Sequence, residues 1–344
     1  MNTPFRENDV ANAFGQQRHV DADHLKGLNP DQKRAVLAVQ GPVLIRAGAG
    51  TGKTTVLTRR AGHIVISGQA QAARVLAITF TRKAAREMQT RLETLLGERV
   101  GRQLTVGNFH QIALRMLRRH AGRLNLSTYF NVVDDDGQRD ILTDLALERN
   151  FIDNKKDRSR IRMIHALICS WKEEGIDVQA CHDAGTLPCL DSLADMRDLE
   201  ALMEEAYVLH GAYQEELRQR RWCDFADLIL HMVRIFRENP DVLDMEAGRF
   251  DHILVDEFQD TSPIQAEFLT LMAKRHRNIC VVGDTDQSIY EWRNARPEIM
   301  MDFPSVWSGC TEITIDRNYR STQEILDLAN QAVEQIGRAS CRER

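Results

Sequence analysis

The stretch AGAGTGKT, residues 47–54, carries residue types that can bind phosphate. It follows the apolar run 43–45 and precedes a segment, 54 to about 66, that we expect to be a helix. A strand, a glycine-rich turn and a helix that opens on Gly-Lys-Thr form the phosphate cradle of a P-loop, because backbone N–H groups and the helix N-terminus favour an anion. The alternative, a flexible loop that carries glycine and lysine by chance, fits this context poorly. The nucleotide-binding candidates are Ala47, Gly48, Ala49, Gly50, Thr51, Gly52, Lys53, Thr54 and Thr55.

A pair of adjacent carboxylates could complete such a site. The segment ILVDE, 253–257, has the pattern of a buried strand that ends at Asp256 and Glu257, and ligands gather at the carboxyl ends of strands in open α/β sheets. We expect Lys53 to reach the β- and γ-phosphates, and Thr54 and Asp256 to hold Mg²⁺. Glu257 would polarise the attacking water as a general base. Asp-Glu after an apolar run is common by chance, so the prediction of ATP or GTP hydrolysis depends on its pairing with the P-loop.

A third stretch, GDTDQSIYEWRNA at 283–295, follows another strand pattern. Gln287 would leave that strand near the nucleotide, where an amide could sense the γ-phosphate. Tyr290 and Trp292 are separated by one residue, lie beside Arg293 and have few apolar neighbours. Exposed aromatic side chains beside arginine suit stacking on unpaired bases, which is worth about 1–3 kcal/mol per base. The alternative is that both rings pack into an interface between domains.

The elements that would position these groups alternate between strands and helices. Continuous apolar runs predict buried strands, and strands that alternate with helices predict an α/β fold with a parallel sheet covered on both faces. Asn29, a following proline and Gln32 predict a capped helix start, which from local spacing alone is the likelier role of Gln32. Thr81 is a predicted helix cap, and Ser262 with Gln265 is a predicted capping box. Besides the run before the P-loop, the predicted strands are 74–80, 104–110, 250–258, 278–284 and 311–315.

Residues 111 to about 221 lack strand patterns and show helical periodicity, which predicts an all-helical insertion. Asp134 and the two acids after it resemble a calcium loop, but the glycine and terminal glutamate positions are wrong. A helix N-cap followed by acids that favour the helix dipole explains them better. The basic run 155–162 is usually a solvated helix face, with contact to duplex DNA as the alternative.

Composition bounds the class of protein. The chain has 344 residues, of which 43% are hydrophobic and 28% charged, ordinary values for a soluble globular protein with two or three domains. A net charge of −5 argues against a broadly basic nucleic-acid binder but allows a local basic track. No apolar run approaches the roughly 20 residues of a membrane helix, and the N-terminus lacks a signal-peptide pattern. The 7 cysteines include no C-x-x-C pair, so we expect reduced thiols and a cytoplasmic location.

Together, the motifs resemble those of superfamily 1 DNA helicases of the UvrD/Rep/PcrA type. The matching segments keep their order over residues 28 to about 323, and the pair VDEFQDT and GDTDQSIY is highly specific. Ala47 at the first P-loop position is the usual form in this family. The segments are LNPDQ, AGAGTGKTT, ITFTRKAAREM, NFH, DFADLI, VDEFQDTSPIQ, VVGDTDQSIYEWRNA and IDRNYRST.

The resemblance implies that the nucleotide is ATP. Gln32 would contact the adenine edge, in place of its capping role, and Tyr319 would stack on the ring. Arg320 would stabilise γ-phosphate charge from a second motor domain, and Gln287 would couple the γ-phosphate to DNA. The implied partner is single-stranded DNA and its junctions with duplex DNA, on a path lined or flanked by Phe80, Thr81, Arg82, Phe109, His110, Tyr290, Trp292 and Arg293.

The implied architecture is a pair of RecA-like domains, the first of which carries the insertion. Family members continue for several hundred residues, so we expect this chain to be an N-terminal portion that binds nucleotide weakly and hydrolyses it poorly. An arginine supplied across such a cleft can be worth about 10³–10⁵ in rate. The predicted division is a loose leader at 1–27, the first RecA-like domain at 28–110 and 222–311, a helical accessory insertion at 111–221, the beginning of the second RecA-like domain at 312–335, and a non-native tail at 336–344.

The implied function is an ATP-dependent DNA helicase or translocase that moves 3′ to 5′ on single strands in repair, replication or recombination, with protein partners that the sequence does not identify. A translocase that remodels DNA–protein complexes without unwinding and the motor part of a helicase–nuclease are alternatives. A nucleotide-dependent binding module without motor function is a further one, against which Glu257 beside Asp256 argues. Three departures from the family pattern could tune DNA contacts: Arg82 for asparagine, Asn108 for threonine and Asn294 for glycine.

Overall fold

The computed structural model describes residues 23–154, 158–194, 196–288, 294–328 and 331. In these ranges, 6 strands form one sheet in the order β3-β2-β6-β7-β1-β8, and 2 short strands form a separate ladder, β4-β5. Every pairing is parallel, which confirms the predicted α/β fold. The strands are β1 (Val43–Ala47), β2 (Val75–Thr79), β3 (Thr105–Asn108), β4 (Asn131–Val133), β5 (Trp222–Asp224), β6 (His252–Val255), β7 (Ile279–Gly283) and β8 (Thr311–Ile315).

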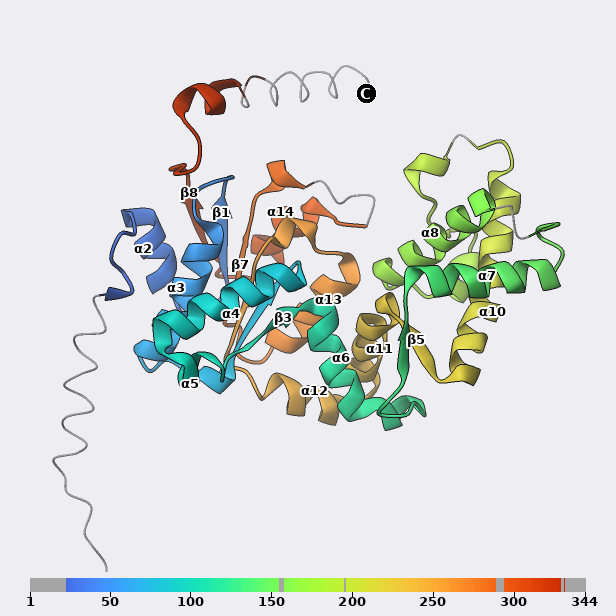
Figure 1. Cartoon of the computed structure of the whole chain (residues 1–344), viewed down its shortest axis with the longest axis horizontal. Helices are drawn as coiled ribbons and strands as arrows, with labels where there is room; N and C mark the ends of the chain where they lie inside the picture. The colour runs from blue at the N-terminus through green and yellow to red at the C-terminus, as the bar shows by residue number, and fades with distance from the viewer. Residues whose placement is uncertain (1–22, 155–157, 195, 289–293, 329–330, 332–344) are drawn as a thin grey trace, which may run out of the picture.

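Helices cover both faces of the large sheet and also build a separate body beside it (Figure 1). The described helices of the sheet domain are α2 (Pro30–Leu37), α3 (Lys53–Ile66), α4 (Arg82–Leu96), α5 (Glu98–Gly101), α6 (Phe109–His120), α11 (Phe225–Glu238), α12 (Pro240–Ala247), α13 (Pro263–Ala273) and α14 (Pro297–Val306). Those of the neighbouring body are α7 (Asp135–Glu148), α8 (Arg158–Glu174), α9 (Val178–Asp183) and α10 (Leu199–Arg220).

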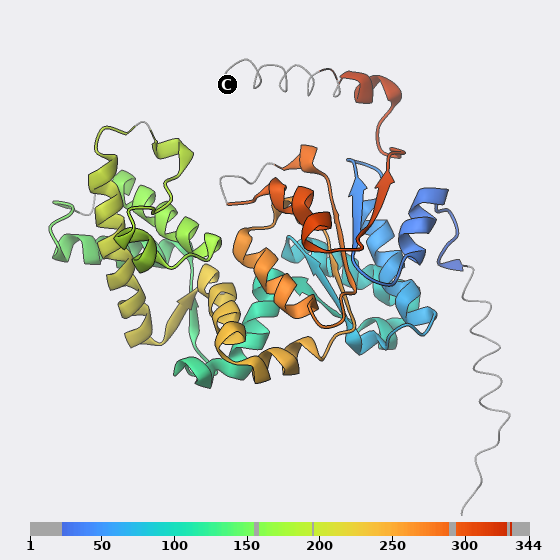
Figure 2. The same ribbon diagram turned by 180° about the vertical axis from the view of Figure 1, so that it is seen from behind.

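The strands are buried on both faces because successive side chains point to opposite sides of a sheet. In β1, Val43 and Ile45 belong to an apolar cluster with α2, α3 and α4, whereas Leu44 belongs to a second cluster with α6, α11 and α13. The first face is turned to the viewer in Figure 1, and α13 and α14 cover the opposite face in Figure 2. This two-sided burial is why the strands appear in the sequence as continuous apolar runs.

The helical insertion has an apolar core of its own, in which Trp171 of α8 and Tyr213 of α10 are almost fully buried. Its two ends meet at the β4-β5 ladder, where Asn131 pairs with Trp222 and Val133 with Asp224. The chain therefore leaves the sheet domain and returns to it side by side.

Two of the predicted domain boundaries differ from the packing. Helix α6 was predicted to lie in the insertion, but its residues Ile112 and Met116 pack in the same cluster as the sheet. Residues 312–315 were predicted to begin a second domain, but β8 pairs along β1 from Thr311 to Ile315 and forms the edge of the first sheet. We therefore move the start of the insertion to the β4-β5 ladder, and the end of the sheet domain beyond Ile315.

Three of the four helix caps predicted from the sequence are present. Asn29 with Gln32 forms a capping box, and Thr81 and Asp134 accept hydrogen bonds from the backbones of α4 and α7, as predicted. Ser262 precedes α13 but makes no side-chain cap, because its Oγ donates instead to Glu173 Oε2 of α8 at 2.6 Å. The predicted capping box there is wrong, since a tertiary contact takes the hydroxyl. None of the described helices is long and apolar enough to cross a bilayer.

Candidate nucleotide and DNA site

The P-loop lies between the end of β1 and the start of α3. Two of its glycines have left-handed backbones, with φ of 74° at Gly50 and 89° at Gly52, which a residue with a Cβ rarely adopts. Gly52 is the N-cap of α3, so the first N–H groups of the helix are free of a side-chain cap and face the loop. The Lys53 side chain at the first helical position is only 8% exposed. The predicted strand, turn and helix are therefore present.

The acidic pair reaches this loop because β6 and β1 both lie beside β7 in a parallel sheet, so that their carboxyl ends share one edge. Thr54 Oγ1 donates to Asp256 Oδ2 at 3.0 Å. Burial of Asp256, together with the negative charge of Glu257, raises the pKa of the Asp256 carboxyl to about 6, even though Thr54 and Lys53 favour the charged form.

Mg²⁺ fits the Thr54 and Asp256 pair. One hydroxyl and one carboxylate, already within hydrogen-bonding distance of each other, match a cation that binds few protein oxygens and shares its remaining positions with phosphate and water. Asp256 is buried and its charged form is disfavoured, so a divalent cation would supply the positive charge that the carboxylate lacks.

A closed ring of polar contacts joins Lys53 to the loops after β6 and β7. Lys53 Nζ lies 3.0 Å from Glu257 Oε2 and donates to Gln287 Oε1 at 3.2 Å. The Gln287 amide donates to the Asp284 carboxylate, and the Asp284 backbone N–H donates to Gln259 Oε1 at 3.0 Å. Gln259 Nε2 closes the ring on Glu257 Oε2 at 2.9 Å. We call these five residues the site ring.

Two backbone features permit the site ring. Glu257 has φ 53° and ψ 49°, a left-handed conformation that is uncommon outside glycine and asparagine and often marks a functional site. It turns the Glu257 side chain from the end of β6 toward Lys53. Gly283 allows the approach of Gln259, because a Cβ at position 283 would lie 2.6 Å from Gln259 Oε1.

Residues 318–320 lie against the P-loop. Asn318 Nδ2 donates to the Ala49 carbonyl at 2.5 Å, and the Tyr319 N–H donates to the Gly50 carbonyl at 2.9 Å. The Tyr319 ring is exposed, its hydroxyl accepts from Asn29 Nδ2 at 3.0 Å, and Arg320 is exposed beside Gly50. The segment predicted to stack on the base is thus next to the phosphate cradle.

Gln32 has two partners in this structure. Its Oε1 accepts from the Asn29 N–H at 3.0 Å, as the capping box requires, and its Nε2 donates to the Thr51 carbonyl at 2.9 Å. The capping role and a brace on the P-loop therefore coexist, and contact with adenine stays a prediction.

Comparison with known proteins identifies the family to which the chain belongs. A sequence profile of the UvrD/REP helicase N-terminal domain matches residues 28–306. The chain belongs to the UvrD/REP helicase family. An ATP-dependent DNA helicase PcrA of Leuconostoc citreum is 38% identical over 307 residues, and a probable DNA helicase II homolog of Rickettsia felis is 37% identical over 313 residues. A PcrA of Staphylococcus aureus is 36% identical over 309 residues.

The matched region covers about nine-tenths of this chain, at 89%, 90% and 90% for the three relatives. It covers 39%, 45% and 40% of the relatives themselves, so the chain spans about two-fifths of their length. The family match includes the P-loop, the acidic pair and Gln287. Tyr319 and Arg320 lie beyond it, and their predicted roles depend on the motif IDRNYRST.

Five of the residues that the family resemblance assigns to DNA lie on the same edge of the sheet. Strands β2 and β3 are parallel neighbours, and their last residues, Thr79 and Asn108, pair with each other. The chain continues from β2 into Phe80, Thr81 and Arg82, and from β3 into Phe109 and His110. Thr81 and Arg82 are exposed, and Phe80 and His110 are half-buried. Tyr290, Trp292 and Arg293 lie outside the described residues.

Phe109 differs from this expectation. Its side chain belongs to the apolar cluster under the sheet and is only 6% exposed. The ring would have to leave that cluster to stack on a base. Asn108 before it is the N-cap of α6 and forms a capping box with Gln111, which gives that departure from the family pattern a structural reason.

Several site residues have no counterpart among the predicted ones. Gln259 and Asp284 complete the site ring, and Asn318 contacts the P-loop.

The motif DFADLI received no role from the sequence. In the structure, Asp224 and Asp227 form the capping box of α11 and also contact Lys172 Nζ of α8, the latter at 2.8 Å, with all three side chains at most 2% exposed. The D-x-x-D spacing could have signalled the capping box, but the buried lysine could not have been found.

Proposed function

We propose that this chain is the ATP-binding part of an ATP-dependent DNA helicase that moves 3′ to 5′ on single-stranded DNA, acting in the cytoplasm in repair, replication or recombination. The observation that carries the proposal is the convergence of Lys53, Thr54, Asp256, Glu257 and Gln287 on one sheet edge. The exposed residues after β2 lie along the same edge, one strand beyond β6. Family membership supports the assignment to a DNA helicase.

The residues divide the chemistry among them. Lys53 and the P-loop N–H groups would bind the phosphates, since a buried lysine at a helix N-terminus offers both charge and donors to an anion. Thr54 and Asp256 would hold Mg²⁺, which when bound neutralises phosphate charge. Glu257 is oriented by Gln259 and Lys53, and would accept the proton of the attacking water. Lys53 would exchange its contacts with Glu257 and Gln287 for the γ-phosphate, which frees both.

That exchange supplies a link from nucleotide to DNA. Gln287 lies in the loop after β7 and contacts both Lys53 and Asp284. A phosphate that draws Lys53 away would change the position of Gln287 and of the segment that follows it, in which the sequence places Tyr290 and Trp292. We propose Tyr319 as the adenine partner, Arg320 as a γ-phosphate contact, and residues 80–82 with His110 as DNA contacts.

The test is a steady-state ATPase assay on the full-length protein with and without single-stranded DNA, followed by unwinding of duplexes that carry a 3′ or a 5′ single-stranded tail. We expect DNA to stimulate turnover and only the 3′-tailed duplex to open. A 5′ preference would refute the direction. Displacement of a DNA-bound protein without strand separation would instead support a remodelling translocase, and turnover that ignores DNA would refute the motor assignment.

A further inference from the structure

The C-terminal turn of α8 contacts the loops that follow β6 and β7. Ser170 Oγ donates to Asn294 Oδ1 at 3.0 Å, Ser262 Oγ donates to Glu173 Oε2 at 2.6 Å, and Arg296 Nε donates to Glu174 Oε1 at 3.2 Å. The partners in the sheet domain are Asn294, Ser262 and Arg296. Each follows the nucleotide-site residues of its loop in the sequence. One turn of the insertion thus contacts both loops that build the site ring.

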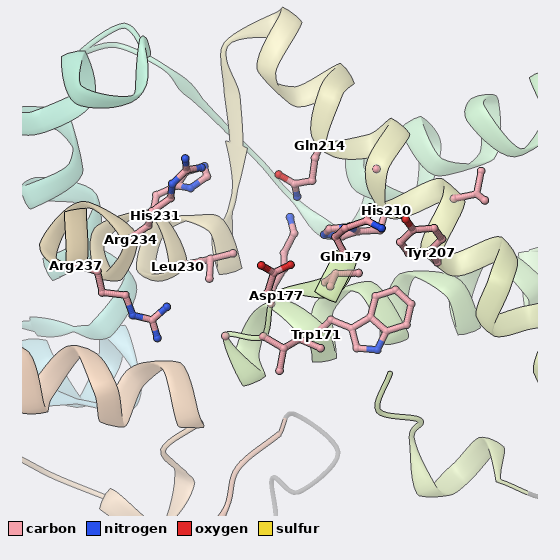
Figure 3. A pocket seen from close by; sticks show the side chains of 16 residues that line it. Trp171, Asp177, Gln179, Tyr207, His210, Gln214, Leu230, His231, Arg234 and Arg237 are labelled. Carbon is pink, nitrogen blue, oxygen red and sulfur yellow. Dashed lines mark hydrogen bonds between the residues drawn. The ribbon is translucent and has the colours of Figure 1, made fainter. Parts of the chain in front are cut away.

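This turn is anchored. Lys172, between the residues that make these contacts, is buried between Asp224 and Asp227 at the start of α11. Burial opposes its charge, but the two carboxylates outweigh that effect and raise the pKa of Lys172, so the lysine stays charged. A cavity of about 630 Å³ adjoins the cluster, with Tyr207, His210 and Gln214 of α10 on one side and His231 and Arg234 of α11 on another (Figure 3). The anchor therefore joins the insertion to the sheet domain at the edge of this cavity.

Asn294 is suited to this contact by its backbone. Its φ is 56°, in the left-handed region that asparagine tolerates better than other residues with a Cβ. Glycine would adopt the same conformation but would offer no oxygen to Ser170. The next residues are also fixed, because Ala295 is buried and the Arg296 N–H donates to the Thr261 carbonyl at 3.2 Å. Glycine at position 294 would thus keep this backbone conformation but lose the side-chain bond to Ser170.

The loop after β7 is consequently held at two points. Gln287 is bound to Lys53 and Asp284 in the nucleotide site, and Asn294 is bound to Ser170 in the insertion. A contact at the far end of the loop gives a fixed point against which Gln287 can shift. Without the Ser170–Asn294 bond, residue 294 would be held only through its neighbours Ala295 and Arg296, so part of the displacement would be absorbed there.

We propose that Ser170 and Asn294 are positioning residues that hold the far end of this loop against the insertion, so that DNA binding is coupled to ATP turnover. The proposal rests on the proposed function of the nucleotide site. It assigns to the insertion a role in coupling that is separate from any contact of its own with DNA.

The experiment compares Asn294→Gly, Ser170→Ala and the double variant in the full-length protein. Asn294→Gly keeps the left-handed backbone and removes only the side-chain bond. Asn125→Gly is the matched control, because Asn125 also has a positive φ, 55°, and ends the short turn at 121–124 that follows α6. The readouts are turnover without DNA, turnover at saturating single-stranded DNA, and the DNA concentration for half-stimulation.

We expect turnover without DNA and the KM for ATP to be unchanged, and DNA-stimulated turnover to fall about two- to tenfold in each single variant, the range of one neutral hydrogen bond. The double variant should be no worse than either single variant, since both remove the same bond. Stimulated turnover equal to that of the parent in both single variants would overturn the proposal, as would fully additive losses.

Hydrogen exchange separates this proposal from the proposed function. The amide of Arg296 should exchange faster in Ser170→Ala, while amides of α8 and of the P-loop helix keep the parental rate. Unchanged exchange at Arg296 would overturn the contact whatever the ATPase result. A parent protein that shows no DNA-stimulated turnover would instead refute the proposed function, and this coupling role with it.

Discussion

Replacing Lys172 with methionine should reveal how strongly the insertion is anchored to the sheet domain. Lys172 is the cation between Asp224 and Asp227, and each of the three side chains is at most 2% exposed. Methionine keeps the length of the apolar stem and removes the charge. Two buried carboxylates would then lie side by side without a counterion.

Removing one partner of a buried ion pair destabilises a fold by about 3–5 kcal/mol, because the remaining charge stays desolvated. We expect a loss in that range in the free energy of unfolding at about pH 8. Without Lys172, burial holds the pKa values of both carboxyls above their unfolded values. Their protonated forms are then favoured in the folded state, so the penalty grows as the pH rises and shrinks toward pH 5.

The assay is urea unfolding of the chain, followed by tryptophan fluorescence, at several pH values. Lys274→Met, at an exposed position just after α13, is the matched control and should change little. Adding Asp224→Asn and Asp227→Asn to Lys172→Met should recover much of the loss, since asparagine can still accept the capping bonds of α11. A penalty below about 1 kcal/mol at every pH, or a triple variant as unstable as the single one, would refute the reasoning.

Three further predictions concern the nucleotide site. Glu257→Gln should abolish turnover and keep ATP affinity, since an amide cannot accept the proton of water; surviving turnover, measured by phosphate release, would contradict the base assignment. Gly50→Ala should weaken nucleotide binding by about tenfold or more in a fluorescent-nucleotide titration, because its φ of 74° is strained for alanine and the Cβ would lie 2.7 Å from Arg320 Cβ. Gly68→Ala, at φ 72° in open space, is its control and should leave affinity unchanged. The pKa of Asp256 is raised to about 6, so its carboxylate gains a proton as the pH falls through 6, and Mg²⁺-dependent nucleotide binding should then weaken. Calorimetric titration measures this affinity, and a flat profile between pH 5 and about 8 would argue against Asp256 as a ligand.

Much of the fold could be predicted because its signals are local. A strand buried on both faces is an apolar run, and a capped helix start is a short pattern of side chains that bond to their own backbone, as at Asn29 and Thr81. Partners distant in the sequence are not local. Ser262 has the sequence of a cap, but Glu173, 89 positions away, takes its hydroxyl. Strand β8 was predicted as a strand, but its pairing with β1 depends on the whole sheet.

The site shows the same division. Lys53, Thr54, Asp256 and Glu257 stand in motifs whose spacing follows from phosphate and Mg²⁺ chemistry, so their types and order indicate their roles. The sequence alone does not predict the direction of the Gln259 side chain or its partners. It bridges Glu257 and Asp284 only because β6 and β7 are neighbours and because position 283 has no Cβ.

The short β4-β5 ladder has a consequence for the modular construction of this chain. The two strands are parallel, and Asn131 pairs with Trp222 and Val133 with Asp224. The chain therefore returns from the insertion beside the point where it left and in the same direction. Parallel strands need a crossover connection of about a dozen residues, so a link of that length could join the end of β4 to the beginning of β5 in place of the helical body. The sheet domain could therefore lose, acquire or exchange the whole helical body by recombination at this neck, without rerouting any strand of its sheet.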